Sequence, residues 1–202
     1  TISCAAGIRR RDCPRRRRLS PWVWTTLSVL YRENTLLDIK KEIREITGEK
    51  LDKSVAIIQR AFGTVADEMG YTEALVPVFP AFTTIEKLKE LKARGAVFFG
   101  LFVDGKQVGF VAVEKENDGK YYMKRLAVPP ELRHRGYGRE LVNHVIEYVR
   151  NKGHQKLHIT IVDENPVLKN WYLGMGFKET LVRKFEHLPF NVSFMELDIA
   201  QC

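Results

Sequence analysis

The sequence predicts one α+β domain, in which helices flank a largely antiparallel sheet. Hydrophobic residues make up 45% of the 202 residues and charged residues 29%, a mixture that can bury a core. Three consecutive apolar segments within residues 96–128 are separated by Asp104-Gly105 and Asp118-Gly119. Asp-Gly between apolar segments is a strong hairpin signal, so we expect these segments to form an antiparallel meander.

One strand and one long helix are expected before the meander. Residues 40–47 alternate between polar and apolar side chains, as a strand with one buried face does. Apolar residues then recur at helical spacing over residues 55–69. Asp52 is the expected N-cap of this helix, and Gly70 is suited to end it.

A second helix is expected after a loop. Residues 76–82 contain two prolines and are typical of a loop. Thr83 and Glu86 have the spacing of a capping box, which opens a helix that Gly95 can end.

After the meander the sequence predicts a helix, a strand, a short helix and a last pair of strands. The first helix covers residues 139–152, and the strand covers residues 156–162. Asn165 is a good N-cap for the short helix, which runs to Gly174, and the last strands fall within residues 177–199. The apolar face of the first helix consists of Leu141, Val142, Val145, Ile146 and Val149.

The positive charge is concentrated at one end of the chain. Of the net charge of +8, residues 1–35 carry +6, because they hold eight arginines and two acidic residues. We therefore expect a disordered or non-native arginine-rich leader over residues 1–35, followed by a domain over residues 36–202. A secretion signal or membrane anchor and a nucleic-acid-binding arm are the alternatives for this leader. For the nearly neutral domain we expect no nucleic acid and no membrane as partner.

The three cysteines indicate neither a disulfide framework nor a zinc site. Cys4, Cys13 and Cys202 are odd in number and lack the paired spacing of zinc ligands. The five histidines show no metal-ligand spacing either, so we expect no metal. A reducing, cytoplasmic location fits this cysteine usage.

The segment "ELRHRGYGR", residues 131–139, is the strongest functional signal. It has the spacing Arg-x-x-Gly-x-Gly and lies between an expected strand and an expected helix. The start of a helix exposes unpaired N–H groups and a partial positive charge, so it attracts phosphate. Neither a Walker motif nor a dinucleotide fingerprint fits, because the segment lacks Gly-Lys-Ser/Thr, a third glycine and a following parallel βαβ unit. We therefore predict a phosphate-binding loop of another kind.

This loop and two other features resemble the GNAT superfamily of acyl-CoA-dependent N-acyltransferases. "LAVPPELRHRGYGRELV" (126–142) is similar to the coenzyme A signature of that family, and "ENPVLKNWYLGMGF" (164–177) to its following helix and strand. The meander precedes both, as it does in the family. The resemblance implies a mixed sheet with separated central strands, acetyl-CoA as the cosubstrate and a primary amine as the acceptor. The acceptor is left open between a small molecule and a peptide or protein, and a homodimer is left open as well.

The resemblance also implies the binding residues. The backbone of the 126–128 segment would pair with pantetheine, the 133–139 segment would hold the pyrophosphate, and Asn165 would lie near the cofactor. The cofactor-binding residues implied in this way are Leu126, Ala127, Val128, Arg133, His134, Arg135, Gly136, Tyr137, Gly138, Arg139 and Asn165.

Acyl transfer to an amine requires a neutral amine and protonation of the leaving thiolate. Tyr172 matches the tyrosine of the family motif and is the candidate general acid. Many relatives carry an acidic residue on the strand before the loop, where this sequence has Lys124 and Arg125. Glu114 is therefore the candidate base, with Glu116 or a water chain as the alternative. The competing expectation for each glutamate is a solvated residue at the strand edge. A degenerate relative that binds acyl-CoA without turnover is the competing hypothesis.

Overall fold

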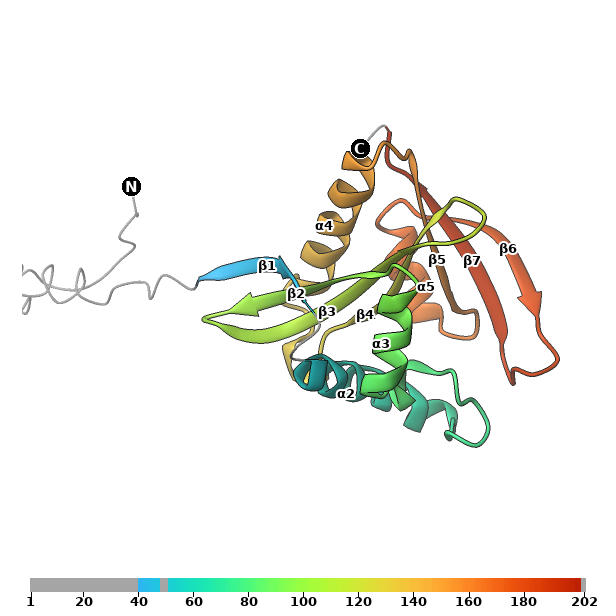
Figure 1. Cartoon of the computed structure of the whole chain (residues 1–202). Coiled ribbons are helices and arrows are strands. Elements are labelled where there is room, and N and C mark those ends of the chain that lie inside the picture. Colours follow the sequence, from blue (N-terminus) through green and yellow to red (C-terminus); the bar gives the residue numbers. More distant parts are fainter. Residues whose placement is uncertain (1–39, 48–50, 201–202) are drawn as a thin grey trace, which may run out of the picture. The chain divides into compact units, whose positions relative to one another are not determined.

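A computed structural model describes residues 40–47 and 51–200, which belong to one compact unit (Figure 1). Its centre is a seven-stranded mixed sheet with the strand order β1-β2-β3-β4-β5-β7-β6. Only β4 and β5 are parallel neighbours among these strands, and all other neighbours are antiparallel. The strands are β1 (Lys41–Glu45), β2 (Val97–Val103), β3 (Lys106–Lys115), β4 (Tyr121–Ala127), β5 (Lys156–Val162), β6 (Lys178–Lys184) and β7 (Asn191–Asp198).

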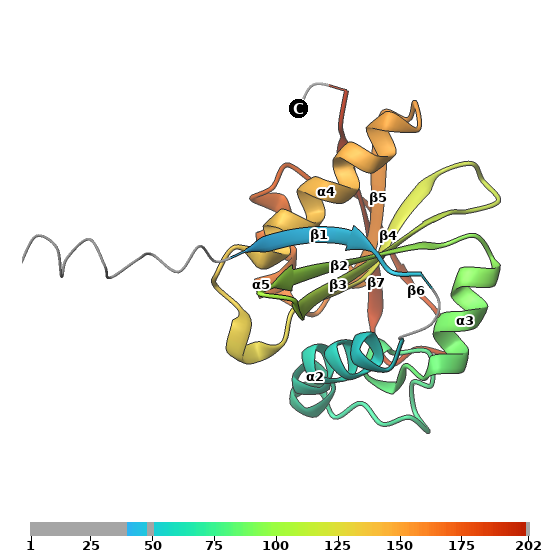
Figure 2. The ribbon, with the colours of Figure 1, turned by 60° about the vertical axis from the view of Figure 1, so that its left-hand side comes forward.

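Helices cover both faces of the sheet (Figure 2). α2 (Leu51–Met69) and α3 (Ile85–Ala93) pack on one face through a core that includes Ile58, Leu88 and Phe110. α4 (Tyr137–Asn151) and α5 (Pro166–Leu173) pack on the other face through a larger core. Two short 3₁₀ turns, η1 (Pro80–Phe82) and η2 (Pro130–Leu132), connect these elements.

The expected order of strands and helices is confirmed, and so is the apolar face of α4. All five residues predicted for that face are buried, with exposures from 0 to 9%. Both Asp-Gly pairs lie between successive antiparallel strands of the meander. The Asn165 side chain caps α5, because its Oδ1 accepts a hydrogen bond from Leu168 N at 2.9 Å.

Three local predictions are wrong. Asp52 lies inside the first turn of α2. The cap of α3 is Thr84, whose Oγ1 accepts from Lys87 N at 3.3 Å. The preceding residue, Thr83, belongs to the end of η1, because its N–H donates to Pro80 O.

The third wrong prediction is that no parallel βαβ unit follows the loop. In the structure β4, α4 and β5 form such a unit. A meander predicts antiparallel neighbours within itself and says nothing about a strand that joins after a helix. This unit places the loop before α4 at the carboxyl end of β4, where ligands of open α/β sheets bind.

The leader and the three cysteines lie outside the described residues. No helix in residues 40–47 and 51–200 is long and apolar enough to cross a membrane.

Candidate active site

The central strands β4 and β5 pair over only two residues. Tyr121 pairs with Leu157 and Tyr122 with His158, and no further pairing joins the two strands. β4 continues to Ala127 and β5 to Val162, so the two strands separate toward their carboxyl ends. On its other side β4 remains paired with β3 as far as Ala127. The separation leaves the backbone of β4 free on the β5 side, where an extended ligand can pair with it as an additional strand.

A bulge in β4 lies in this unpaired part. Phe110 pairs with Ala127 and Ala112 with Lys124, so two β4 residues lie opposite Val111. Arg125, one of the two, has a φ of +52°, in the left-handed region that non-glycine residues rarely occupy. Lys124 lies on the face of α2 and α3, and the Arg125 side chain reaches Thr83 next to α3, so the bulge sends two successive side chains toward that face.

The loop after β4 ends in the start of α4. Gly136 is the N-cap with a φ of +83°, and Glu140 N donates to Gly136 O at 3.0 Å as the first bond of the helix. The N–H groups of residues 136–139 therefore precede the helical hydrogen-bond ladder and point out of its end. Position 136 requires glycine for its backbone conformation, whereas Gly138 lies within the helix, where a Cβ would lie 3.5 Å from the Trp171 ring. This helix start fits a diphosphate.

The arginines of the loop differ in what they contact. Arg133 Nη2 donates to Ala61 O at 2.8 Å and to Thr64 Oγ1 at 3.2 Å, so its side chain fastens the loop to α2. Arg135 and Arg139 are exposed and have no carboxylate partner among the described residues. Their charges are available to a phosphate. The contacts of Arg133 connect positions about 70 residues apart in sequence, which local spacing does not predict.

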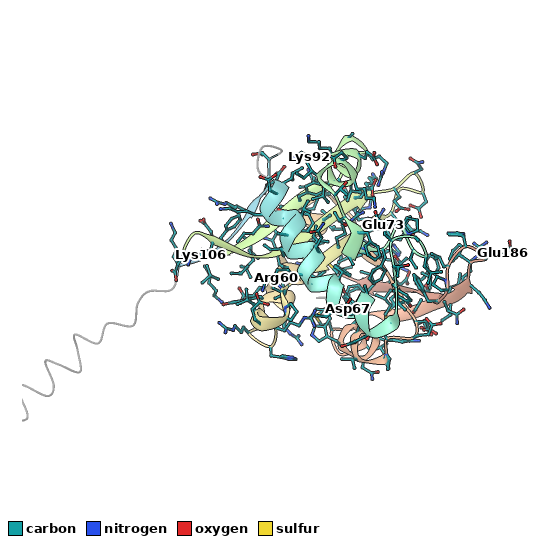
Figure 3. All side chains as sticks on the ribbon, turned by 90° about the horizontal axis from the view of Figure 1, so that it is seen from below. Arg60, Asp67, Glu73, Lys92, Lys106 and Glu186 are labelled. Carbon is teal, nitrogen blue, oxygen red and sulfur yellow. The ribbon has the colours of Figure 1, made fainter. Side chains whose placement is uncertain are left out.

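Two ion pairs support the same loop from outside it, and both were missed in the sequence. Arg60 of α2 has its Nη2 2.6 Å from Glu131 Oε1 in η2, and Figure 3 shows Arg60 on the outer side of α2. Lys41 of β1 has its Nζ 2.7 Å from Glu140 Oε1. Because Glu140 lies in the first turn of α4, Lys41 offsets a negative charge that would otherwise oppose a bound phosphate.

Tyr172 lies in the core between α5 and the sheet. Its exposure is 5%, and its ring makes edge contacts with Trp171 and Phe177. Burial raises the pKa of Tyr172 well above the ordinary value of a phenol, so the hydroxyl stays protonated at neutral pH. A protonated phenol is the form that a general acid needs.

Glu114 is buried on β3 and held by two cations. Its Oε2 lies 2.7 Å from Lys124 Nζ and its Oε1 lies 3.1 Å from Arg94 Nε. Burial raises the pKa of this carboxyl, but the two cations outweigh it and the net pKa is lowered. The expectation that Glu114 is a solvated edge residue is wrong, because its exposure is 5%. A carboxylate with a lowered pKa and two bound cations is a weak base.

Aromatic residues from distant segments form two separate groups. Phe79, Phe82 and Phe190 belong to one cluster, together with Tyr71 and Val162 at the end of β5. Phe185 instead packs against Phe194 on the β6–β7 hairpin. On the same sheet face as Glu114, a hollow of about 380 Å³ is bordered by Tyr122, His158, Leu181 and Phe194. No group of three potential metal-ligating side chains occurs in the residues that the structure describes.

A mixed sheet with separated central strands, followed by a helix whose first amides are free, is the arrangement of the α+β acyltransferase fold. The model of the acetyltransferase (GNAT) family matches residues 66–177, more than half of the chain, and the chain belongs to this family.

Individual relatives agree with this assignment. The uncharacterized N-acetyltransferase MJ1207 of Methanocaldococcus jannaschii is 34% identical over 95 residues, which cover 43% of this chain and 41% of that protein. The chain thus spans about two-fifths of the length of this relative.

Solved structures share the fold at low identity. The PaiA N-acetyltransferase of Thermoplasma acidophilum, solved with coenzyme A, superposes with a TM-score of 0.66 at 21% identity, over 79% of this chain and 99% of that one. The ribosomal-protein-S18-alanine N-acetyltransferase of Escherichia coli superposes with a TM-score of 0.64 at 20% identity, over 81% and 96% of the two chains.

Proposed function

We propose that the protein transfers an acetyl group from acetyl-CoA to a primary amine by direct attack in a ternary complex. The observation that carries this proposal is the unpaired carboxyl half of β4, which leads directly into the free amides at the start of α4. Pantetheine fits the unpaired half of β4, and a diphosphate fits the amides at the start of α4. The two groups follow each other in the same order along coenzyme A. Membership of the acetyltransferase family and the coenzyme A complex of PaiA support the choice of cosubstrate.

The proposal gives the binding residues two kinds of role. The backbone of Leu126, Ala127 and Val128 pairs with the pantetheine arm, and one of its N–H groups stabilises the oxyanion. The amides of residues 136–139, with the charges of Arg135 and Arg139, hold the pyrophosphate. Arg133 holds the loop in place through α2, and His134 contributes its backbone. Asn165 acts by capping α5, which carries Tyr172.

The chemical step needs one proton removed and one supplied. The neutral amine attacks the thioester carbonyl, the carbon–sulfur bond breaks, and the nitrogen loses a proton to water. Tyr172 donates its proton to the leaving thiolate and recovers one from solvent. Glu114 remains the candidate base from the sequence, and its two ion pairs favour a charge-balancing role instead.

The full chain tests this function in two measurements. Calorimetry with coenzyme A and acetyl-CoA measures donor binding, and thiol release with a panel of amines measures turnover. We expect binding at micromolar concentrations and amine-dependent thiol release above the hydrolysis background. Binding without release for any amine would support an acyl-CoA sensor, and absence of binding at millimolar coenzyme A would remove the proposal altogether.

A further inference from the structure

Among residues 40–47 and 51–200, Arg125 forms no ion pair with a carboxylate. Its Nε has one hydrogen bond, to Thr83 Oγ1 at 3.4 Å. No carboxylate of the described residues pairs with it, because Glu114 is already bound by Arg94 and Lys124. The charged groups that act on its guanidinium are Arg94, which repels it, and Glu114, which attracts it but is held by Arg94 and Lys124.

The two Nη groups of Arg125 are open to a ligand. Arg125 is half-buried and burial lowers its pKa, although an arginine stays charged. No side-chain nitrogen or oxygen in the described part of the chain is both fully buried and without a partner. The Nη groups, which have no hydrogen bond to a described residue, are therefore accessible from outside.

The backbone at this position is held in an unfavourable conformation. Arg125 has a φ of +52° at the β4 bulge, and strained non-glycine residues of this kind concentrate at functional sites. The bulge turns the side chain toward the face of α2 and α3, one residue before the segment proposed to pair with pantetheine. The guanidinium therefore lies on the face of the sheet opposite α4, whose first turn is proposed to hold the diphosphate.

We propose that Arg125 binds a carboxylate of the acceptor, so that the substrate is an amino acid that carries its amine and its carboxylate close together. This inference rests on the proposed acetyl transfer and names its substrate class. A guanidinium presents two parallel N–H donors that match a carboxylate, and a desolvated guanidinium binds it more strongly than an exposed one. Phe82, which precedes Thr83 and belongs to the aromatic cluster with Phe79, offers an apolar surface beside this position. An amino acid with an apolar side chain fits both features.

Matched substrates test the charge directly. Phenylalanine and leucine are compared with phenylalaninamide and leucinamide, which keep the amine and the side chain and lose only the carboxylate. The amine of an amide has the lower pKa and is more often neutral, so a preference for the acid cannot come from amine ionisation. We expect the wild-type full chain to have a kcat/KM at least tenfold higher for the acids.

Variants at one position separate this contact from general charge effects. Arg125→Gln should reduce the acid preference about 10- to 100-fold, the range for a lost hydrogen bond to a charged group, and leave the Kd of coenzyme A unchanged. Arg125→Lys should restore part of the preference, because it returns the charge without the planar fork. Arg44→Gln removes an exposed cation on β1 and should change nothing.

A binding measurement covers the case in which a variant does not fold or turnover is slow. In calorimetry of the wild-type coenzyme A complex, N-acetylphenylalanine should bind at least tenfold more tightly than its amide. Equal binding of the two products, or equal acetylation of acids and amides, would overturn the carboxylate proposal and leave acetyl transfer intact. A preference for O-phosphoethanolamine alone would overturn the carboxylate proposal and indicate that Arg125 binds a phosphate of the acceptor. Loss of coenzyme A binding would instead contradict the proposed function.

Discussion

Lys124 Nζ lies 2.7 Å from Glu114 Oε2, and this contact joins β3 and β4 directly before the bulge. Arg94, the residue directly after α3, completes the cluster at 3.1 Å from the other carboxylate oxygen. A buried carboxylate is stable only when cations and hydrogen bonds replace its lost water. The cluster thus connects the end of α3 with β3 and β4, next to the bulge that positions Arg125.

Glu114→Gln should lower the free energy of unfolding at pH 7 by about 1–3 kcal/mol, because Arg94 loses its carboxylate partner and Lys124 loses one of its two partners. The folded-state pKa of Glu114 is lowered, so its contribution to stability is present above the ordinary glutamate pKa and is lost as the pH falls through the folded value. The variant should therefore lose less stability than the wild type on acidification. Denaturant unfolding at several pH values measures both effects.

Glu116→Gln is the matched control for that variant. Glu116 also pairs with Lys124, but its side chain is 40% exposed, so we expect a cost below about 1 kcal/mol in the free energy of unfolding.

If Glu114 were the catalytic base, Glu114→Gln would abolish the acid limb of the pH profile of kcat/KM. We expect that limb to remain.

Gly136→Ala should weaken coenzyme A binding. A side chain at a φ of +83° is strained by about 1–2 kcal/mol, and relief of the strain would turn the N–H groups away from the diphosphate. Gly153→Ala introduces the same strain, at a φ of +79°, after the other end of α4. Both variants should lose similar stability, but only Gly136→Ala should raise the Kd of coenzyme A, by about tenfold or more. Equal Kd values of coenzyme A for the two variants would show that the loop at Gly136 does not bind the diphosphate.

Local patterns predict most of the fold, because each depends on neighbours in sequence. The buried face of α4 follows from helical spacing, and the Asn165 cap follows from two adjacent residues. The predicted cap of α3 was wrong by one residue. Thr83 and Thr84 are equally good caps in the sequence, and only the structure shows that Thr83 ends η1.

The missed features are contacts between distant segments. The parallel pairing of β4 and β5, the attachment of Arg133 to α2 and the position of the Arg125 side chain depend on residues 36 to 72 positions apart. The one available signal was Lys124-Arg125 in a strand, where two successive cations require a bulge or an exposed face. The sequence suggested only that an acidic residue was missing there.

The arginines of the loop should separate into two functional groups. Arg133→Gln removes hydrogen bonds to Ala61 and Thr64 and should lower the free energy of unfolding by about 1–2 kcal/mol. Arg135→Gln removes an exposed charge, so it should leave stability within about 0.5 kcal/mol and raise the Kd of coenzyme A several-fold at low salt. The increase should shrink in 0.5 M NaCl. A Kd of Arg135→Gln that is unchanged at low salt would show that this charge does not reach the phosphates.

Tyr172→Phe should lower kcat about 100-fold or more with an unchanged Kd for coenzyme A, because it removes the proposed proton donor and keeps the ring that packs against Trp171 and Phe177. Burial raises the folded-state pKa of Tyr172 above that of the unfolded chain, so the folded protein holds this proton more tightly. Stability from this group is complete below about pH 10 and falls at higher pH by up to about 1.4 kcal/mol per unit. Tyr172→Phe should remove that part of the loss of stability at alkaline pH.

Tyr148→Phe is the control, because burial also raises the pKa of Tyr148, which lies on α4 against Phe99. It should reduce the alkaline loss without a change in kcat, and a kcat for Tyr172→Phe within twofold of the wild type would assign Tyr172 to packing alone.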